Sequence, residues 1–468
     1  MSEFTYDYSE LQRQYRPQGS VLATTAFLAM VACVINCALP QIEMLLTGGR
    51  CPLPIAFVKI ACFGLLTLLT LVYGRLDLSA FPTGMWLVAM TFLLLDFPFL
   101  WLSRNKTPLE ILLSYNAYYC PLIFAPLACA FTGRLSEKSA TRILVYIFLV
   151  CGIIGCAQII FQKPIIQMAS SDGNFRIYTS WWITVGAPGT VGERTMRAFG
   201  VFGTAMEYGS FAVLIAATAI GVCGRPKGWV KGVPLYLFAA ACCYTTRTRV
   251  VYLELIFATL AAATFTFGRR PRRMTWQPFI GLVLGSVIAF SGIVQVVGEK
   301  ASVYDPSSLE LRLLQWGTYG AQILHAEVPQ QMLGFGYSQA EKPSVIPVGD
   351  EQAEQFINTL VDNTYLALAL HIGLVGMVVI LGLLWAMWRR LRIETIMRPT
   401  PLLIGIASFW STFLLTGMFN IQLAIYGFWF LIAIMTLQRD GEADVGSPDL
   451  RQPDPLFALA SESAQSVP

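Results

Sequence analysis

The chain of 468 residues is 55% hydrophobic and only 13% charged, which is about half of the charged fraction typical of soluble domains. This composition excludes an ordinary soluble domain, and the long apolar runs exclude an intrinsically disordered chain. The net charge of +4, from 32 Lys and Arg against 28 Asp and Glu, gives little support to a nucleic-acid partner. The sequence therefore predicts an integral membrane protein.

Twelve mostly apolar segments of roughly bilayer-spanning length predict an all-α polytopic fold. In chain order we expect transmembrane helices at 21–39, 55–73, 85–102, 110–131, 143–161, 204–223, 233–245, 250–267, 278–297, 364–388, 401–418 and 421–437.

The distribution of Lys and Arg orients these helices, because cytoplasmic loops carry an excess of positive charge. With the N-terminus inside, the short cytoplasmic loops hold fifteen Lys and Arg in 53 residues. The two long loops on the other side, 162–203 and 298–363, hold four and three. Both termini are therefore expected inside. The predicted parts are a cytoplasmic tail (1–20), helices 1–9 (21–297, with the outer loop 162–203), the large outer loop (298–363), helices 10–12 (364–437) and a disordered cytoplasmic tail (438–468).

The two outer loops contain local signals. Trp181 and Trp182 are typical of a membrane–water interface. In the large loop, Asp305 can cap a helix that has Pro306 as its first residue. We expect one face of that helix to pack on the membrane domain or, alternatively, to bind substrate; its residues are Leu309, Leu313, Trp316, Gly320, Ile323 and Leu324.

Arginines on the outer side are unexpected, because orientation rules favour them inside. Arg197 precedes the sixth helix, Arg247 and Arg249 lie in the turn between helices seven and eight, and Arg312 lies on the loop helix. Each alone is compatible with a membrane anchor. Together they indicate an anion site, since guanidinium groups grip phosphate bidentately. Glu254, seven residues after Arg247, is expected on the same helical stripe, where it pairs with that arginine or compensates a buried charge.

Two further motifs lie on the outer side. Gly334 and Gly336 flank Phe335 and form either an ordinary turn or a nest of backbone N–H groups that binds an anion. Asp362 and Asn363 open the tenth helix, followed by Tyr365. An acid there is first a helix cap, and its boundary position leaves a general-base role open.

The order of these motifs resembles the bacterial O-antigen ligase and polymerase superfamily. The resemblance rests on Arg197-x-x-Gly200, Thr-Arg in the outer turn, Arg312…Trp316, Gly-Phe-Gly and Asp362-Asn363-x9-Gly-x-x-Gly, and it spans about 190–390. It implies a metal-independent, cofactor-free glycosyltransferase of the GT-C type at the periplasmic face of the bacterial inner membrane. The implied donor and acceptor are undecaprenyl-diphosphate-linked oligosaccharides, with a chain-length regulator as a possible partner. Arg197 and either Arg247 or Arg249 would stabilise the diphosphate.

Within that superfamily, ligases that transfer glycan to lipid A–core usually carry His where this chain has Asp362. A carboxylate can also take the proton of an acceptor hydroxyl. The predicted function is therefore a polysaccharide or O-antigen polymerase, in which Asp362 is the base and the acceptor attacks with inversion. The alternatives are a ligase of the same superfamily and, from another class, a flippase or transporter of lipid-linked glycans, which would bind substrate near the bilayer midplane.

Overall fold

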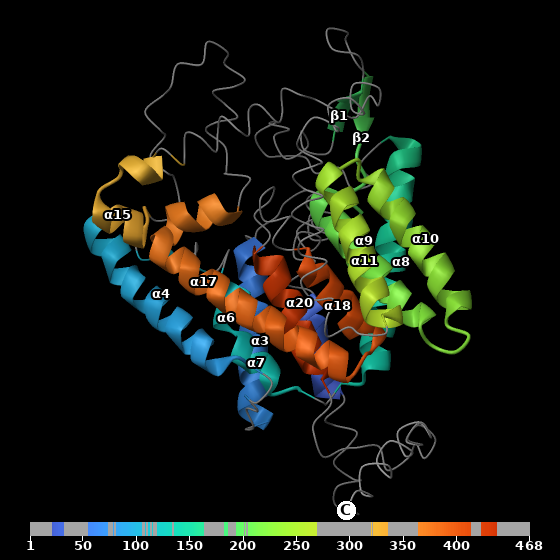
Figure 1. The fold of residues 1–468 in the computed structure, drawn as a ribbon, viewed down its shortest axis with the longest axis horizontal. Coiled ribbons are helices and arrows are strands. Elements are labelled where there is room, and N and C mark those ends of the chain that lie inside the picture. The colour runs from blue at the N-terminus through green and yellow to red at the C-terminus, as the bar shows by residue number, and fades with distance from the viewer. Residues whose placement is uncertain are drawn as a thin grey trace, which may run out of the picture.

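The structure is a computed structural model of the chain. It describes residues 21–31, 55–73, 78, 81–104, 108, 111–112, 115, 119–132, 135–162, 182–185, 193–200, 202, 205–268, 320, 322–335, 364–412 and 423–437. Apart from one short β-ribbon, the regular elements of this part are helices (Figure 1). The helical class that the sequence predicts is therefore confirmed.

The helices follow the apolar segments along the chain. They are α3 (Ile55–Tyr73), α4 (Thr83–Arg104), α6 (Cys120–Ile123), α7 (Ala125–Cys129), α8 (Glu137–Phe161), α9 (Ala205–Cys223), α10 (Trp229–Thr245), α11 (Arg249–Phe267), α15 (Val328–Leu333), α17 (Thr364–Met397), α18 (Pro401–Ser411) and α20 (Leu423–Thr436). Residues 21–31 are also helical. The ribbon pairs β1 (Trp182–Val185) antiparallel with β2 (Glu193–Met196), so that Trp182 lies opposite Met196.

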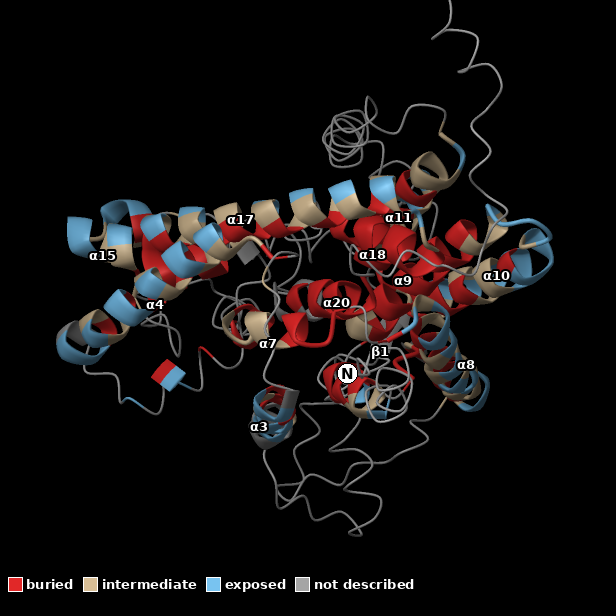
Figure 2. Cartoon of the chain, turned by 90° about the horizontal axis from the view of Figure 1, so that it is seen from below, coloured by how far each residue is buried: buried red, intermediate tan, exposed pale blue. Residues whose placement is uncertain are grey.

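The core is built around α9, which packs against α10, α11 and α18. Every residue of α9 from Tyr208 to Gly221 is buried, as is α18 from Pro401 to Trp410. A helix that is apolar on all sides belongs in the interior. Figure 2 shows α9, α18 and α20 as the buried centre of the molecule.

Helices at the periphery turn large apolar side chains outward. On α8 these include Val150, Ile153 and Ile160, each more than half exposed, and α4 and α8 are pale along their outer sides in Figure 2. Such stripes are unfavourable in water and are the surface that lipid covers.

Five described helices are long and apolar enough to cross a membrane, namely α4, α8, α9, α11 and α17. Shorter apolar helices cover Val21–Val31, Ala61–Val72 and Pro401–Ser411. The protein is therefore described as a multi-helix membrane protein. The expected ninth span, 278–297, lies outside the described residues, so the number of twelve stays a prediction.

Helices α8, α10 and α17 extend at least four residues beyond their predicted ends into the supposed cytoplasmic loops. Helix α8 begins at Glu137 rather than 143 because Ser136 caps it, its hydroxyl accepting from the Ser139 amide. Helix α17 continues to Met397, where an ion pair of 2.7 Å from Arg390 to Glu394 supports its last turns. It ends just before Pro399. Helix α10 begins at Trp229 rather than 233. Hydropathy marks the apolar part of a helix, and the added ends of α8 and α17 are rich in polar and charged residues.

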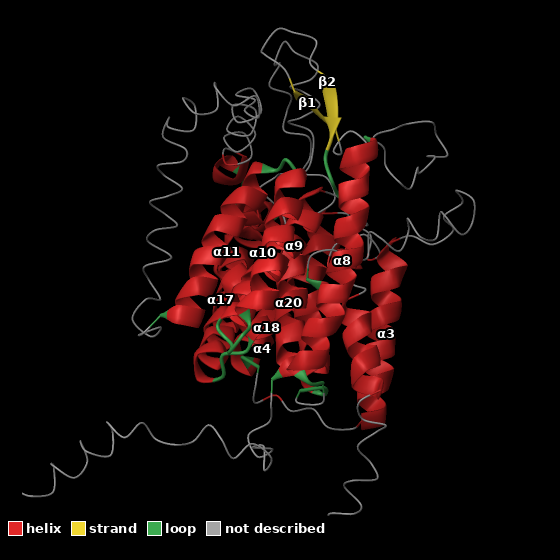
Figure 3. Ribbon diagram, turned by 90° about the vertical axis from the view of Figure 1, so that its right-hand side faces the viewer, coloured by secondary structure: helices red, strands yellow, loops and turns green. Residues whose placement is uncertain are grey.

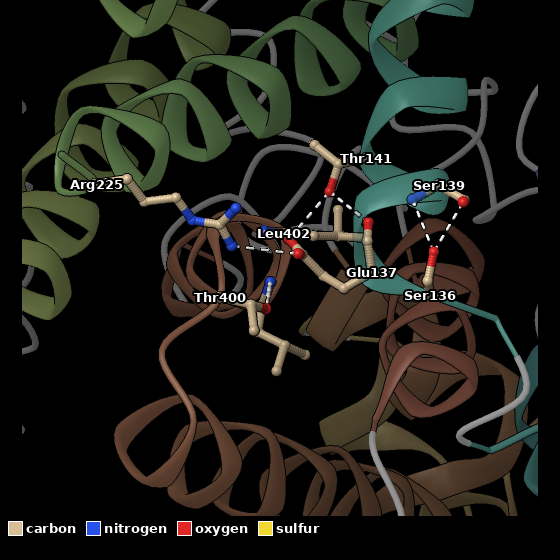
Figure 4. Close-up of polar contacts among 8 residues, drawn as sticks. Ser136, Glu137, Ser139, Thr141, Arg225, Thr400 and Leu402 are labelled. Carbon is tan, nitrogen blue, oxygen red and sulfur yellow. Dashed lines mark hydrogen bonds and ion pairs between the residues drawn. The ribbon is translucent and has the colours of Figure 1, made fainter. Parts of the chain in front are cut away.

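Glu137 joins three elements at the end of the bundle opposite the ribbon (Figures 3 and 4). Its carboxylate accepts from Arg225 of the α9–α10 connection at 3.3 Å and from the Leu402 amide of α18 at 3.2 Å. It also accepts from the Thr141 hydroxyl at 3.1 Å. One carboxylate thereby fixes the beginnings of α8 and α18 relative to α9.

Candidate anion site at one end of the bundle

The residues around Arg197 are anchored to the end of α8 by two glutamine side chains. The Gln158 carbonyl oxygen accepts from the amides of Phe199 at 3.0 Å and Gly200 at 2.9 Å, and its NH₂ donates to the Gly200 carbonyl at 2.8 Å. Gln162 accepts from the Met196 amide at 3.0 Å. Gln158 is buried, so these bonds are shielded from competing water. The backbone on both sides of Arg197 is therefore held in one position.

Gly200 is required by the geometry of this segment. Its φ of +57° lies in the left-handed region, which glycine enters without steric cost. A Cβ at this position would also lie only 3.0 Å from the Cys151 carbonyl oxygen and 3.0 Å from the Tyr208 ring. The spacing Arg-x-x-Gly thus has a physical reason, because the glycine lets the chain turn against α8 and into α9.

The turn between α10 and α11 is internally bonded. The Thr246 hydroxyl donates to the Cys243 carbonyl at 2.7 Å, and the Thr248 hydroxyl donates to the Thr246 carbonyl at 3.0 Å. Arg247 has φ +49°, a conformation that costs a non-glycine residue about 1–2 kcal/mol. Both threonines are buried. The expected tight turn is therefore present, and it holds Arg247 in a strained conformation.

One hydrogen bond brings the two arginine segments together. The Ala198 amide donates to the Thr245 carbonyl at 3.0 Å, so the residue after Arg197 touches the last residue of α10. Arg247 and Arg249 follow within four residues, and all three arginines are half-buried. Arg197 and Arg247 both lie near enough to the Tyr252 phenol to act on it electrostatically. We call this part of the molecule the arginine end; β1 and β2 lie beside it (Figure 1).

The structure corrects the expected relation between Glu254 and Arg247. Helix α11 begins at Arg249, so Arg247 lies outside the helix and the two residues share no helical stripe. Glu254 is fully buried, and its Oε2 accepts from the Ser210 hydroxyl of α9 at 2.9 Å. Among the described residues, its Oε1 has no hydrogen-bond partner. Glu254 therefore links α9 to α11 one to two turns below the arginine end.

Gly334 does not form the anion nest that its motif suggested as one option. Its amide donates to the Gln330 carbonyl at 2.8 Å and closes α15, and the Phe335 amide donates to the Leu370 carbonyl of α17 at 2.7 Å. Both N–H groups are thus used inside the protein. The described part of the motif, Gly334 and Phe335, docks α15 against α17, and Ile323 packs beside it on Ala369 and Leu370. Leu324, expected on the same face, is 74% exposed, because neighbouring helical residues point in different directions.

The remaining predicted site residues divide into two groups. Tyr365 is half-buried in the first turn of α17. Arg312, Gly336, Asp362 and Asn363 lie outside the described residues. The structure therefore brings together the two segments that carry Arg197, Arg247 and Arg249, and it tests neither Arg312 nor the proposed base.

Sequence reasoning pointed to Asp96 as a charge near the membrane midplane, but it did not predict the contacts of the buried polar side chains between α4 and α17. The Tyr115 hydroxyl donates to Asp96 Oδ2 at 2.8 Å, and the Tyr119 hydroxyl and His371 Nδ1 share a hydrogen bond of 2.8 Å. The rings of Tyr119 and His371 stack at 5.4 Å. Sequence reasoning missed Gln158. In both cases the available signal was a polar side chain within an apolar segment.

The described residues include no group of three or more His, Cys, Asp or Glu side chains arranged to hold a metal ion. In comparisons with known proteins, no family model matches the chain and no curated protein sequence matches it.

Proposed function

We propose that the protein is a membrane glycosyltransferase that joins oligosaccharide repeat units carried on undecaprenyl diphosphate, and that it acts at the periplasmic face of a bacterial inner membrane. This proposal assigns the chain to the O-antigen ligase and polymerase superfamily on the motif order described above. The observation that carries it is the Ala198–Thr245 hydrogen bond, which joins the segment of Arg197 to the turn of Arg247 and Arg249.

Three guanidinium groups at the end of a membrane bundle suit a lipid diphosphate better than other anions. Arginine stays charged at physiological pH, and its fork matches phosphate oxygens. The position at a helix end, beside apolar faces that lipid covers, suits a ligand with a phosphate head and a lipid tail. Strained backbone such as that of Arg247 clusters at functional sites, which adds to the argument.

The chemistry follows from charge. The bond between the anomeric carbon and the diphosphate oxygen breaks as the acceptor hydroxyl attacks from the opposite face, and the diphosphate leaves with the electron pair. Arginines held by Gln158 and by the α10–α11 turn stabilise that developing charge without having to reorganise. Asp362 takes the hydroxyl proton. Glu254 serves the site indirectly, because its bond with Ser210 fixes α9 to α11 beneath the arginines.

One observation favours a transporter as the second candidate. Helix α17 is broken at Gly373, where φ is +70°, and broken helices beside buried polar groups are typical of transporter sites. However, the Leu370 carbonyl at the break accepts from the Phe335 amide. The backbone of Phe335, rather than a ligand, thus satisfies the Leu370 carbonyl.

Deleting the gene and separating the surface glycan on a gel tests the proposal. A polymerase deletion leaves single repeat units on the surface. A ligase deletion leaves polymer on the lipid carrier, and a flippase deletion traps units on the cytoplasmic leaflet.

Complementation then tests the residues. Arg197→Ala, Arg249→Ala and Asp362→Asn should each abolish polymer at matched membrane levels. The matched control is Arg225→Ala, which removes an arginine at the opposite end of the bundle and should preserve the polymer ladder. A normal ladder from the Arg249→Ala and Asp362→Asn variants would overturn the assignment.

A further inference from the structure

Two tyrosines lie side by side at the arginine end. Tyr244 belongs to the last turn of α10, and Tyr252 lies one helical turn after Arg249 in α11. Their rings stack with centroids 6.2 Å apart and planes 21° from parallel. Tyr244 is 74% exposed, whereas Tyr252 is half-buried. We call these two residues the tyrosine pair.

The tyrosine pair is tied to the turn that carries Arg247. The Tyr244 carbonyl accepts from the Arg247 amide at 3.1 Å, and it also accepts from the Tyr252 hydroxyl at 3.0 Å. One carbonyl thereby fixes the Tyr252 ring relative to the strained residue of the turn. The stacked ring of Tyr244 is held beside that turn in consequence.

Both arginine segments lie close to the tyrosine pair. Arg247 and Arg197 each act electrostatically on the Tyr252 phenol. The residue that follows Arg197 donates its amide to the carbonyl of Thr245, which is the chain neighbour of the pair. An aromatic surface and the proposed diphosphate site therefore share one end of the bundle.

The surroundings of the tyrosine pair distinguish it from a lipid-facing surface. Toward the middle of α10 and α11, Leu237, Ile256 and Leu260 are each more than half exposed, and aliphatic side chains of this kind suit lipid. Tyrosine at a helix end also suits a membrane–water interface. However, an interfacial anchor needs neither a stacked partner nor a hydrogen bond that ties it to an arginine turn.

The chemistry of the proposed substrate supplies an occupant for this surface. In a glycosyl diphosphate, the anomeric carbon of the first sugar is bonded directly to a phosphate oxygen. Arginines that bind the diphosphate therefore place that sugar beside them. One face of a pyranose ring consists largely of C–H groups, which pack on the face of an aromatic ring while the hydroxyls at the rim stay in water.

We propose that the tyrosine pair binds the pyranose ring attached to the lipid diphosphate, with Tyr244 as the stacking surface and Tyr252 as the residue that holds it in place. This inference rests on the proposed function, and it adds that the site recognises the first sugar as well as the diphosphate. The arginines then bind the charge that all such donors share, and the tyrosine pair distinguishes a sugar-bearing lipid from the bare lipid diphosphate.

The test measures the binding of two lipids to the full-length protein in detergent micelles by native mass spectrometry. One lipid is undecaprenyl diphosphate carrying the single repeat unit, extracted from the deletion strain, and the other is undecaprenyl diphosphate without sugar. Tyr244→Leu should weaken binding of the sugar-bearing lipid by about tenfold and leave binding of the sugar-free lipid within about twofold of the wild type. Tyr244→Trp keeps an aromatic face and should retain most of the affinity for the sugar-bearing lipid.

Two further variants are controls. Tyr146→Leu removes a tyrosine of similar exposure, 62%, from the third turn of α8, and it should change neither affinity. Arg197→Ala removes a group of the proposed diphosphate site and should weaken the binding of both lipids.

The outcomes separate the two proposals. A loss of affinity confined to the sugar-bearing lipid supports the stacking role of Tyr244. Unchanged affinity for both lipids, or an equal loss for both, overturns that role and is the behaviour of an anchor at the membrane interface. If Arg197→Ala binds both lipids as tightly as the wild type, the proposed diphosphate site is wrong, whatever the result for Tyr244. A wild-type protein that binds neither lipid overturns both proposals.

Discussion

Three hydrogen bonds of the Gln158 side chain contribute most to holding the backbone that follows Arg197. Gln158 contributes no charge to the site, and it satisfies two amides and one carbonyl of the segment that carries the arginine. Each buried backbone group that loses its partner costs about 1–3 kcal/mol. The arginine site therefore depends on a neutral residue 39 positions earlier in the chain.

Replacing Gln158 by Leu should be strongly destabilising, because leucine is of similar size and offers no polar atoms. We expect a loss of about 3 kcal/mol or more, seen as a lower midpoint of thermal unfolding in detergent. Gln162→Leu is the matched control: it removes the Met196 contact from a less buried side chain, so its effect should be about 1 kcal/mol. Equal effects from the two variants would contradict the dominant role of Gln158.

At the scale of helices, apolar length predicts boundaries well where a helix lies entirely in the apolar layer. Helix α3 has the predicted bounds 55–73, and α9 and α11 begin within one residue of expectation. Helices whose ends are polar, such as α8 and α17, run further than hydropathy indicates. Their ends are decided by caps and prolines, which act on backbone hydrogen bonds rather than on transfer to lipid.

Contacts between distant segments could not be predicted in this way. Tyr119 and His371 are 252 residues apart and Gln158 and Gly200 are 42 apart, and hydropathy carries no information about which helices are neighbours. The break at Gly373 lies within a continuous apolar run, where its conformation leaves no trace in composition. The arginines were chosen as candidates because the predicted topology places them outside the cytoplasmic loops, where positive charge is unusual; that topology stays a prediction.

The break in α17 gives a prediction about glycine. Gly373→Ala should destabilise the protein by about 3 kcal/mol, because alanine is strained at φ +70° and ψ −179° and its Cβ strikes the Met332 backbone. Gly382→Ala, on the same helix, is the control. There a Cβ would meet only the flexible end of Met85 at 2.9 Å, so the change should be neutral or stabilising by up to about 1 kcal/mol. Thermal unfolding of both variants checks the difference, and comparable midpoints would refute it.

At the scale of the whole molecule, the two ends of the bundle differ in what holds them. At the arginine end, the hydrogen bonds from Gln158, from Gln162 and between Ala198 and Thr245 are neutral contacts to backbone. The opposite end is held by Glu137, which neutralises Arg225 and caps α18. Lys227 and Lys231 nearby are exposed, as expected of a cytoplasmic surface.

This asymmetry predicts the orientation of the protein. Because α9 is long and apolar enough to cross a membrane, the ribbon before it and the α9–α10 connection after it should lie on opposite sides. An epitope inserted after Lys227 should be reached by antibody only from the cytoplasmic side, and one inserted between β1 and β2 only from the periplasmic side. Antibody is added to intact spheroplasts, which expose the periplasmic side, and to inverted vesicles of the same strain, which expose the cytoplasmic side. If antibody reaches both epitopes from the same side, α9 does not span the membrane. If the pattern is reversed, the arginine end faces the cytoplasm, where no periplasmic glycan could reach it.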